Sequence, residues 1–256
     1  MLALCLLLPA APAGAASLAG LVGERLEYRI RWGLVPAARA ELEVAPGPPG
    51  TVVFRARART LAYLDAVFPV RDLVETTVDL ATGRPLLYSK FVREGWRRRP
   101  PVEVHFDPAA GLARRYQGER LARIVPVPPG VQDPLSCFLA YRTRPEATEG
   151  NFTLAVTDGK RVVTGVAVVH RRERVETPAG RFDAILVEPR MEGIGGVFRK
   201  SPGARLWVWL TDDDRRLPVK VETEVIVGRF TAELTAIHAP PGTGPATGTK
   251  GRRPAR

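Results

Sequence analysis

The sequence predicts a mostly β protein, a curled antiparallel sheet or incomplete barrel with one short helix at about residues 134–144. Along most of the chain, apolar and polar residues alternate with a period of two, as in strands that have one buried and one solvated face. The strand-like segments are short and are separated by turn sequences. This pattern is typical of antiparallel sheets that curl on themselves.

The first half of the chain shows the clearest alternation. The segment ERLEYRIRW predicts a half-buried strand, and the segment at 38–44 returns as its partner after a break at 33–36. TVVFRARART predicts a third strand whose three arginines face solvent. Further strands are expected in LVETTVDL, LLYSKFVREG, VEVHFD and GLARRYQG.

The second half of the chain predicts two hairpins and three more strands. FTLAVTDGKRVVTGVAVV turns at Asp158-Gly159, a strong hairpin signal, and RVETPAGRFDAILVEP turns at residues 178–180. The three remaining strands are expected in ARLWVWL, LPVKVETEVIV and RFTAELTAI.

One stretch, QDPLSCFLAYRTRP, has helical spacing. Asp133 is a good N-cap, Pro134 suits the first helical position and Pro145 ends the helix. Cys137 lies in this apolar context, where a buried structural thiol is expected.

Three segments make up the predicted organisation of the chain. Residues 1–15 are a signal peptide, residues 20–238 form a single β-rich domain, and residues 239–256 form a disordered basic tail. The start, MLALCLLLPAAPAGAAS, has an apolar run too short to span a bilayer and an A-x-A cleavage pattern at 13–15. Export to the periplasm followed by cleavage is therefore expected. No transmembrane segment is expected. Lipidation at Cys5 is disfavoured because Leu4 stands where a small residue is needed.

The chain is basic, with 38 Lys and Arg against 27 Asp and Glu. The tail carries four of the positive charges, and the others alternate with acids along the strand faces. No basic run is interleaved with aromatic residues as nucleic-acid binding requires, so no nucleic-acid partner is expected. Two interpretations remain: a solvated basic face, or weak attraction to an anionic envelope surface or a polysaccharide.

The sequence predicts no catalytic residues, no metal site and no cofactor, and the protein is expected not to be an enzyme. Its three histidines are far apart, and Ser136 is not in a nucleophile elbow. The run Asp212-Asp213-Asp214 lies between two strand-like segments and lacks the glycine that a calcium loop uses at its sharp bend. These aspartates are predicted to turn the chain.

The strand LWVWL is apolar on both faces, with Trp207 and Trp209 on one side and Leu206, Val208 and Leu210 on the other. One face is expected to pack on the helix. The other face belongs either to a well-covered central strand or to an apolar cavity for a lipid-like ligand. The candidate ligand-binding residues are Tyr28, Trp32, Trp207 and Trp209.

Several segments resemble the bacterial family called domain of unknown function 3108. They are GERLEYRIRWG, QDPLSCFLAYRTR, VETPAGRFDAILVEP and LWVWLTDDDRRLPVKVETEVIVGRFTAEL. The resemblance implies an exported, envelope-located, β-rich protein of Gram-negative bacteria and brings no catalytic residues. A more distant similarity, at the level of fold, is to the periplasmic lipoprotein-carrier and lipoprotein-receptor proteins.

Two functions are compatible with these features. The first is non-enzymatic binding or carrying of an apolar or amphipathic envelope component, with a lipid or lipoprotein-like ligand. The second is a structural or adaptor module that binds polysaccharide or an envelope protein through its charged strand faces.

Overall fold

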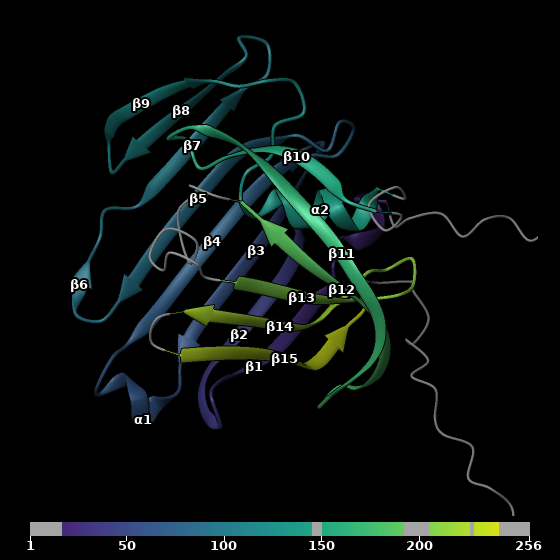
Figure 1. The fold of residues 1–256 in the computed structure, drawn as a ribbon. Helices are drawn as coiled ribbons and strands as arrows, with labels where there is room; N and C mark the ends of the chain where they lie inside the picture. The colour runs from purple at the N-terminus through teal and green to yellow at the C-terminus, as the bar shows by residue number, and fades with distance from the viewer. Residues whose placement is uncertain (1–16, 145–149, 192–204, 226–227, 241–256) are drawn as a thin grey trace, which may run out of the picture.

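A computed structural model describes residues 17–144, 150–191, 205–225 and 228–240. Within these ranges, fifteen strands form one antiparallel sheet (Figure 1). The strands are β1 (Arg25–Trp32), β2 (Val35–Pro46), β3 (Thr51–Thr60), β4 (Val70–Asp79), β5 (Pro85–Glu94), β6 (Arg97–Arg98), β7 (Val102–Asp107), β8 (Leu112–Gln117), β9 (Arg120–Pro126), β10 (Phe152–Thr157), β11 (Val162–Thr177), β12 (Gly180–Arg190), β13 (Arg205–Thr211), β14 (Pro218–Val225) and β15 (Gly228–His238). The helical elements are η1 (Ala19–Leu21), α1 (Ala62–Asp65) and α2 (Ser136–Thr143).

The last strand of the chain pairs with the first, so the two halves of the sequence form one continuous sheet. The strand order runs from β10 through β15 to β1 and on to β9, with β6 paired beside β5. The sheet curls without closing into a barrel, which confirms the predicted fold class. Its two ends approach each other where the Arg123 guanidinium of β9 donates a hydrogen bond of 3.0 Å to the Lys160 carbonyl, beside β10.

Helix α2 lies inside the curl and supplies the centre of the core. Leu139 packs with Phe54 and Tyr88 on one wall, and Tyr141 packs with Val208 on the other. The apolar cavity left between α2 and strands β10–β13 is only about 60 Å³. Since a water molecule occupies roughly 30 Å³, side chains fill this part of the interior almost completely.

Side chains form hydrogen bonds with the free backbone groups at both ends of α2. The Asp133 carboxylate accepts hydrogen bonds from the Leu135 and Ser136 amides at 2.7 and 2.8 Å, which confirms its capping role. The regular helix begins at Ser136 and not at Pro134. At the other end, the Arg216 guanidinium donates to the Tyr141 carbonyl at 3.0 Å and so satisfies one of the free carbonyls of the last turn.

Asp213 builds the turn between β13 and β14, as predicted for this run of aspartates. Its carboxylate accepts hydrogen bonds from the Thr211 hydroxyl at 2.5 Å and from the Arg215 and Arg216 amides at 3.1 and 3.2 Å. Burial would raise the pKa of Asp213, but these bonds and the Arg215 side chain outweigh it and hold the pKa below its ordinary value. The same turn places Arg216, with φ of 45°, against α2.

Four elements were not expected from the sequence: the short helical elements η1 and α1 and the strands β6 and β9. The two predicted hairpins of the second half share one long strand, β11. None of the helices in the described ranges is long and apolar enough to span a membrane. The predicted signal peptide, residues 1–15, and all but the first two residues of the predicted tail lie outside the described residues.

Candidate functional site

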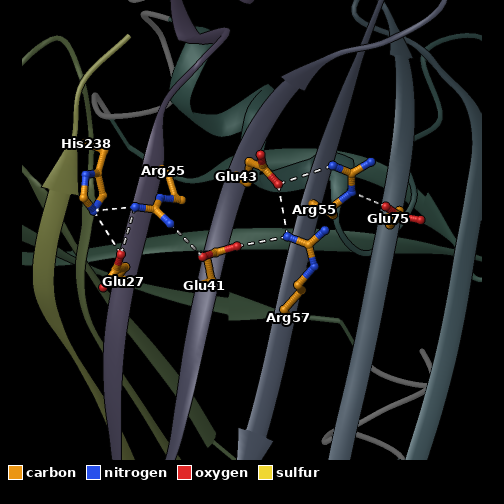
Figure 2. Close-up of polar contacts among 8 residues, drawn as sticks. All are labelled: Arg25, Glu27, Glu41, Glu43, Arg55, Arg57, Glu75 and His238. Atoms are coloured by element: carbon orange, nitrogen blue, oxygen red, sulfur yellow. Dashed lines mark hydrogen bonds and ion pairs between the residues drawn. The ribbon is translucent and has the colours of Figure 1, made fainter.

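The face of the sheet turned away from α2 carries a ladder of alternating charges from β15 to β4 (Figure 2). Arg57 on β3 contacts Glu41 and Glu43 on β2 at 3.0 and 3.1 Å, and Arg25 on β1 contacts Glu41 at 3.5 Å. The side chains of Arg25 and Arg57 are more than 40% exposed, so each such pair contributes at most about 1 kcal/mol. The ladder is therefore nearly balanced in charge and only weakly stabilising.

A row of five arginines runs beside this ladder on the same face. Strand register places the five directly opposite one another, one on each of five neighbouring strands. In order from β1 to β5 they are Arg29, Arg39, Arg59, Arg71 and Arg93. We call this set the arginine row. Like charges directly opposite each other on paired strands destabilise a sheet.

Two members of the arginine row contact acids of the same protein. Arg29 contacts Glu233 of β15 at 2.9 Å, and Arg31 contacts the same carboxylate at 2.9 Å. Arg71 forms an ion pair with Asp65 of α1. The Arg71 guanidinium, the Thr60 hydroxyl and the nearby charge of Arg59 lower the pKa of Asp65 to about 2.

The centre of the row has no direct acidic partner among the described residues. Among the residues that the structure describes, Arg39 and Arg59 form no hydrogen bond or ion pair through their side chains, and both residues are exposed. Each like-charged neighbour costs about 0.2–1 kcal/mol. A bound anion would remove this repulsion.

A groove of about 880 Å³ lies over this part of the sheet. Three carboxylate residues and six arginines border it, and four of these arginines belong to the arginine row. The six are Arg25, Arg29, Arg39, Arg57, Arg59 and Arg71. Its size falls in the range of sites for small organic ligands, about 300–1,000 Å³.

One end of the groove is apolar. Leu73 on β4 lies directly opposite Phe91 on β5, and both border the groove together with Leu61, which precedes α1. Phe91 is 41% exposed. The groove thus combines guanidinium groups, which bind phosphate and carboxylate in a bidentate manner, with an apolar surface a few residues away.

The structure does not gather the four candidate ligand-binding residues in one site. Of the four, only Tyr28 borders the groove. Its ring is buried, its hydroxyl donates to the Pro218 carbonyl at 2.7 Å, and burial raises its pKa. Trp32 is exposed at the end of β1 and stacks on Phe230 with ring centroids 6.2 Å apart.

Trp207 and Trp209 pack in a cluster with residues of β11 and β12, such as Val175 and Leu186. The Trp209 indole donates a hydrogen bond of 2.6 Å to Glu173 of β11, and the Lys220 ammonium lies 4.6 Å from its ring centroid. Neither tryptophan borders the groove or the small apolar cavity. The strand LWVWL is a well-covered central strand. Val208 and Leu210 pack toward α2, and Trp207 and Trp209 pack with Val175 and Phe182 of the β11–β12 hairpin.

The arginines were visible in the sequence as polar members of alternating strands, but not as a site. Segments such as RARAR show which residues share one face of one strand. They do not show which residue lies opposite on the next strand, because register depends on turn lengths and bulges. Among the described residues, no group of three or more His, Cys, Asp or Glu side chains could hold a metal ion.

Fold and groove together define a curled, barrel-like antiparallel β protein with a basic groove on its outer face. The sequence matches the model of a protein family of unknown function, DUF3108, over residues 27–235. The chain belongs to this family. A comparison with curated proteins finds no match.

Solved structures with a similar fold include a β-barrel-like protein of DUF1849 from Brucella abortus. It aligns with a TM-score of 0.58 and 13% identity, covering 86% of this chain and 99% of that chain. A protein from Parabacteroides distasonis provisionally described as a lipoprotein aligns with a TM-score of 0.34 and 9% identity over 86% of this chain and 96% of that one. A protein from Bacteroides fragilis provisionally described as exported, with a YmcC-like fold, aligns with a TM-score of 0.31 and 12% identity. This alignment covers 88% of this chain and 99% of that chain. These last two scores are too low to support an argument.

Proposed function

We propose that this protein is a non-enzymatic binding protein of the bacterial cell envelope that holds an amphipathic anion in the groove across β1–β5. The observation that carries the proposal is the centre of the arginine row, at Arg39 and Arg59, where no described carboxylate contacts either guanidinium. A ligand with a phosphate or carboxylate group would accept hydrogen bonds from these guanidinium groups and relieve their mutual repulsion. Its apolar part would lie on Leu73 and Phe91.

The small volume of the interior cavity favours ligand binding on the outer face of the sheet. The apolar cavity beside α2 is far too small for an acyl chain, while the groove has room for a headgroup and part of a chain. Envelope location is part of the proposal and rests on the predicted signal peptide and the A-x-A pattern at its end. No chemical step is assigned, because Glu27 and Glu41 at the groove are engaged by neighbouring arginines.

A second candidate is an adaptor that binds an acidic polysaccharide. The arginine row favours it, since five neighbouring strands present guanidinium groups over a span of about 19 Å. An extended polyanion would match this spacing, but it would leave Leu73 and Phe91 exposed. We therefore rank the amphipathic anion first.

Native mass spectrometry tests the proposal on protein produced with its own leader and purified after export. We expect an extra mass that organic solvent removes and that carries an acidic headgroup and an acyl chain. The variant Arg39→Gln/Arg59→Gln should lose this mass, while Arg120→Gln, an exposed arginine of β9 outside the groove, should retain it. Protein that carries no added mass and binds no acidic amphiphile would overturn the proposal, and binding of acidic polysaccharide alone would favour the second candidate.

A further inference from the structure

Exposed apolar side chains gather at the end of the sheet where β1, β3 and β5 finish. They belong to the β1–β2 turn, the α1 segment and the β5–β6 turn. The most exposed are Leu34 at 90%, Val67 at 73% and Trp96 at 71%. We define the apolar rim as Trp32, Leu34, Tyr63, Val67, Phe68 and Trp96, all of which are about half exposed or more.

Contacts hold the segments of the rim together. The Tyr63 hydroxyl of α1 donates to the Pro36 carbonyl at the start of β2. The Gly95 amide in the β5–β6 turn donates to the Pro69 carbonyl at 2.8 Å. A Cβ atom at Gly95 would lie 2.9 Å from the Phe68 ring, so these two turns pack closely. Figure 1 shows α1 at the lower left of the sheet and β6 above it at the left edge, both away from β9.

Basic residues flank the rim at Trp96. Arg93, near the end of β5, is exposed, and Glu94 is the one acid between it and Trp96. Arg99 is 55% exposed and only loosely paired with Glu94, at 3.9 Å. The one acid of α1, Asp65, is already engaged by Arg71. The rim therefore presents aromatic and aliphatic tips within a positively charged border.

We propose that the apolar rim docks this protein onto an anionic lipid bilayer. Side chains such as Trp96 and Leu34 would enter the boundary between headgroups and acyl chains, where aromatic residues and long basic residues are most favourable. Arg93 and Arg99, on either side of Trp96, would contact anionic headgroups, as basic residues do at membrane surfaces. The rim consists of the tips of separate turns with charges between them, which suits a soft lipid interface better than a flat protein partner.

The rim also adjoins the groove. Leu61 borders the groove and directly precedes α1, and Arg71 both borders the groove and holds Asp65 of α1. A protein docked by its rim would have one end of the groove near the headgroup layer. The docking surface is nevertheless distinct from the ligand site, because Leu34, Phe68 and Trp96 do not border the groove.

Vesicle co-sedimentation tests this proposal on the full exported protein. The probes are vesicles of phosphatidylcholine with phosphatidylglycerol, and vesicles of phosphatidylcholine alone. Wild-type protein should sediment with the anionic vesicles, and raised salt should weaken binding. The variant Leu34→Ser/Trp96→Ser should bind at least about tenfold more weakly, because each large apolar side chain transferred from water contributes that order of affinity.

The matched control is Leu121→Ser/Ile124→Ser on β9, which removes two exposed apolar side chains outside the rim. It should bind vesicles like the wild type. Equal binding by the rim variant and the wild type would overturn the proposal. So would failure of wild-type protein to bind anionic vesicles, or equal binding to both kinds of vesicle.

Discussion

Arg39 on β2 lies directly opposite Arg59 on β3, and neither guanidinium has a hydrogen-bond or ion-pair partner among the described residues. On the neighbouring strands, Arg39 also lies opposite Arg29, and Arg59 also lies opposite Arg71. Folding this sheet brings these charges together, and no described carboxylate contacts either of the two guanidinium groups directly. A local loss of folding stability of this kind is typical of functional sites, where the groups that activity requires destabilise the folded protein.

Replacing one of these arginines should weaken ligand binding without lowering the stability of the fold. We expect Arg39→Gln to leave the free energy of unfolding unchanged or to raise it by up to about 1 kcal/mol, because a like-charged contact is removed. The same variant should bind acidic amphiphiles about tenfold more weakly, as loss of a charge-assisted hydrogen bond implies. Urea unfolding and a binding titration measure the two quantities. A clear loss of stability in Arg39→Gln but not in Arg120→Gln would contradict this account.

Asp65 provides a pH test of the ion pair at the edge of the arginine row. Its pKa in the folded protein is about 2, below the ordinary value of 3.8, first because of the Arg71 guanidinium. Since the folded pKa is the lower one, the pair stabilises the fold above the ordinary pKa, and this contribution is lost as the pH falls from 3.8 to about 2. NMR titration of the Asp65 carboxyl should show a midpoint near 2 that moves toward the ordinary value in Arg71→Gln. An unshifted midpoint in both proteins would show that the pair does not form in solution.

The buried ion pair between Glu24 and Arg142 should be essential to the position of α2. The two contacts are 2.6 and 2.9 Å, and only 2% of the Arg142 side chain and 7% of the Glu24 side chain are exposed. Arg142→Ala should lower the free energy of unfolding by about 3–5 kcal/mol, because it leaves a buried carboxylate without a partner. The double variant Glu24→Leu/Arg142→Met should be less destabilised than Arg142→Ala in urea unfolding. A smaller effect of the single change would indicate that water reaches Glu24.

The turn after β13 distinguishes Asp213 from its neighbour Asp214. Asp213→Ala should lower the free energy of unfolding by about 1–2 kcal/mol, because it removes the acceptor for two backbone amides and for Thr211. Asp214→Ala is the matched control, since the Asp214 carboxylate takes no part in these bonds. Thermal unfolding compares the two variants, and equal midpoints would contradict the role given to Asp213.

Much of the fold could be predicted because local patterns specify local structure. The alternation in ERLEYRIRW and TVVFRARART predicted β1 and β3, and Asp133 predicted the start of α2 within two or three residues. Strand β9 was missed because its sequence, RLARIVP, does not alternate regularly; in the structure Val125 is buried, while Leu121 and Ile124 are exposed. The site was missed for a different reason: its members lie on five separate strands.

The sequence by itself determined which side chains share a face of each strand, where the chain turns, and that one short helix interrupts the strands. These features depend on the period of two and on the chemistry of Asp, Gly and Pro, both of which act within a few residues. Only the tertiary structure decided which strands pair and in what register. The contact between Arg29 and Glu233 joins residues 204 positions apart, and the alignment of five arginines depends on every turn and bulge between β1 and β5. The covering of Trp207 and Trp209 by β11 and β12, which left these tryptophans outside the groove, was decided in the same way.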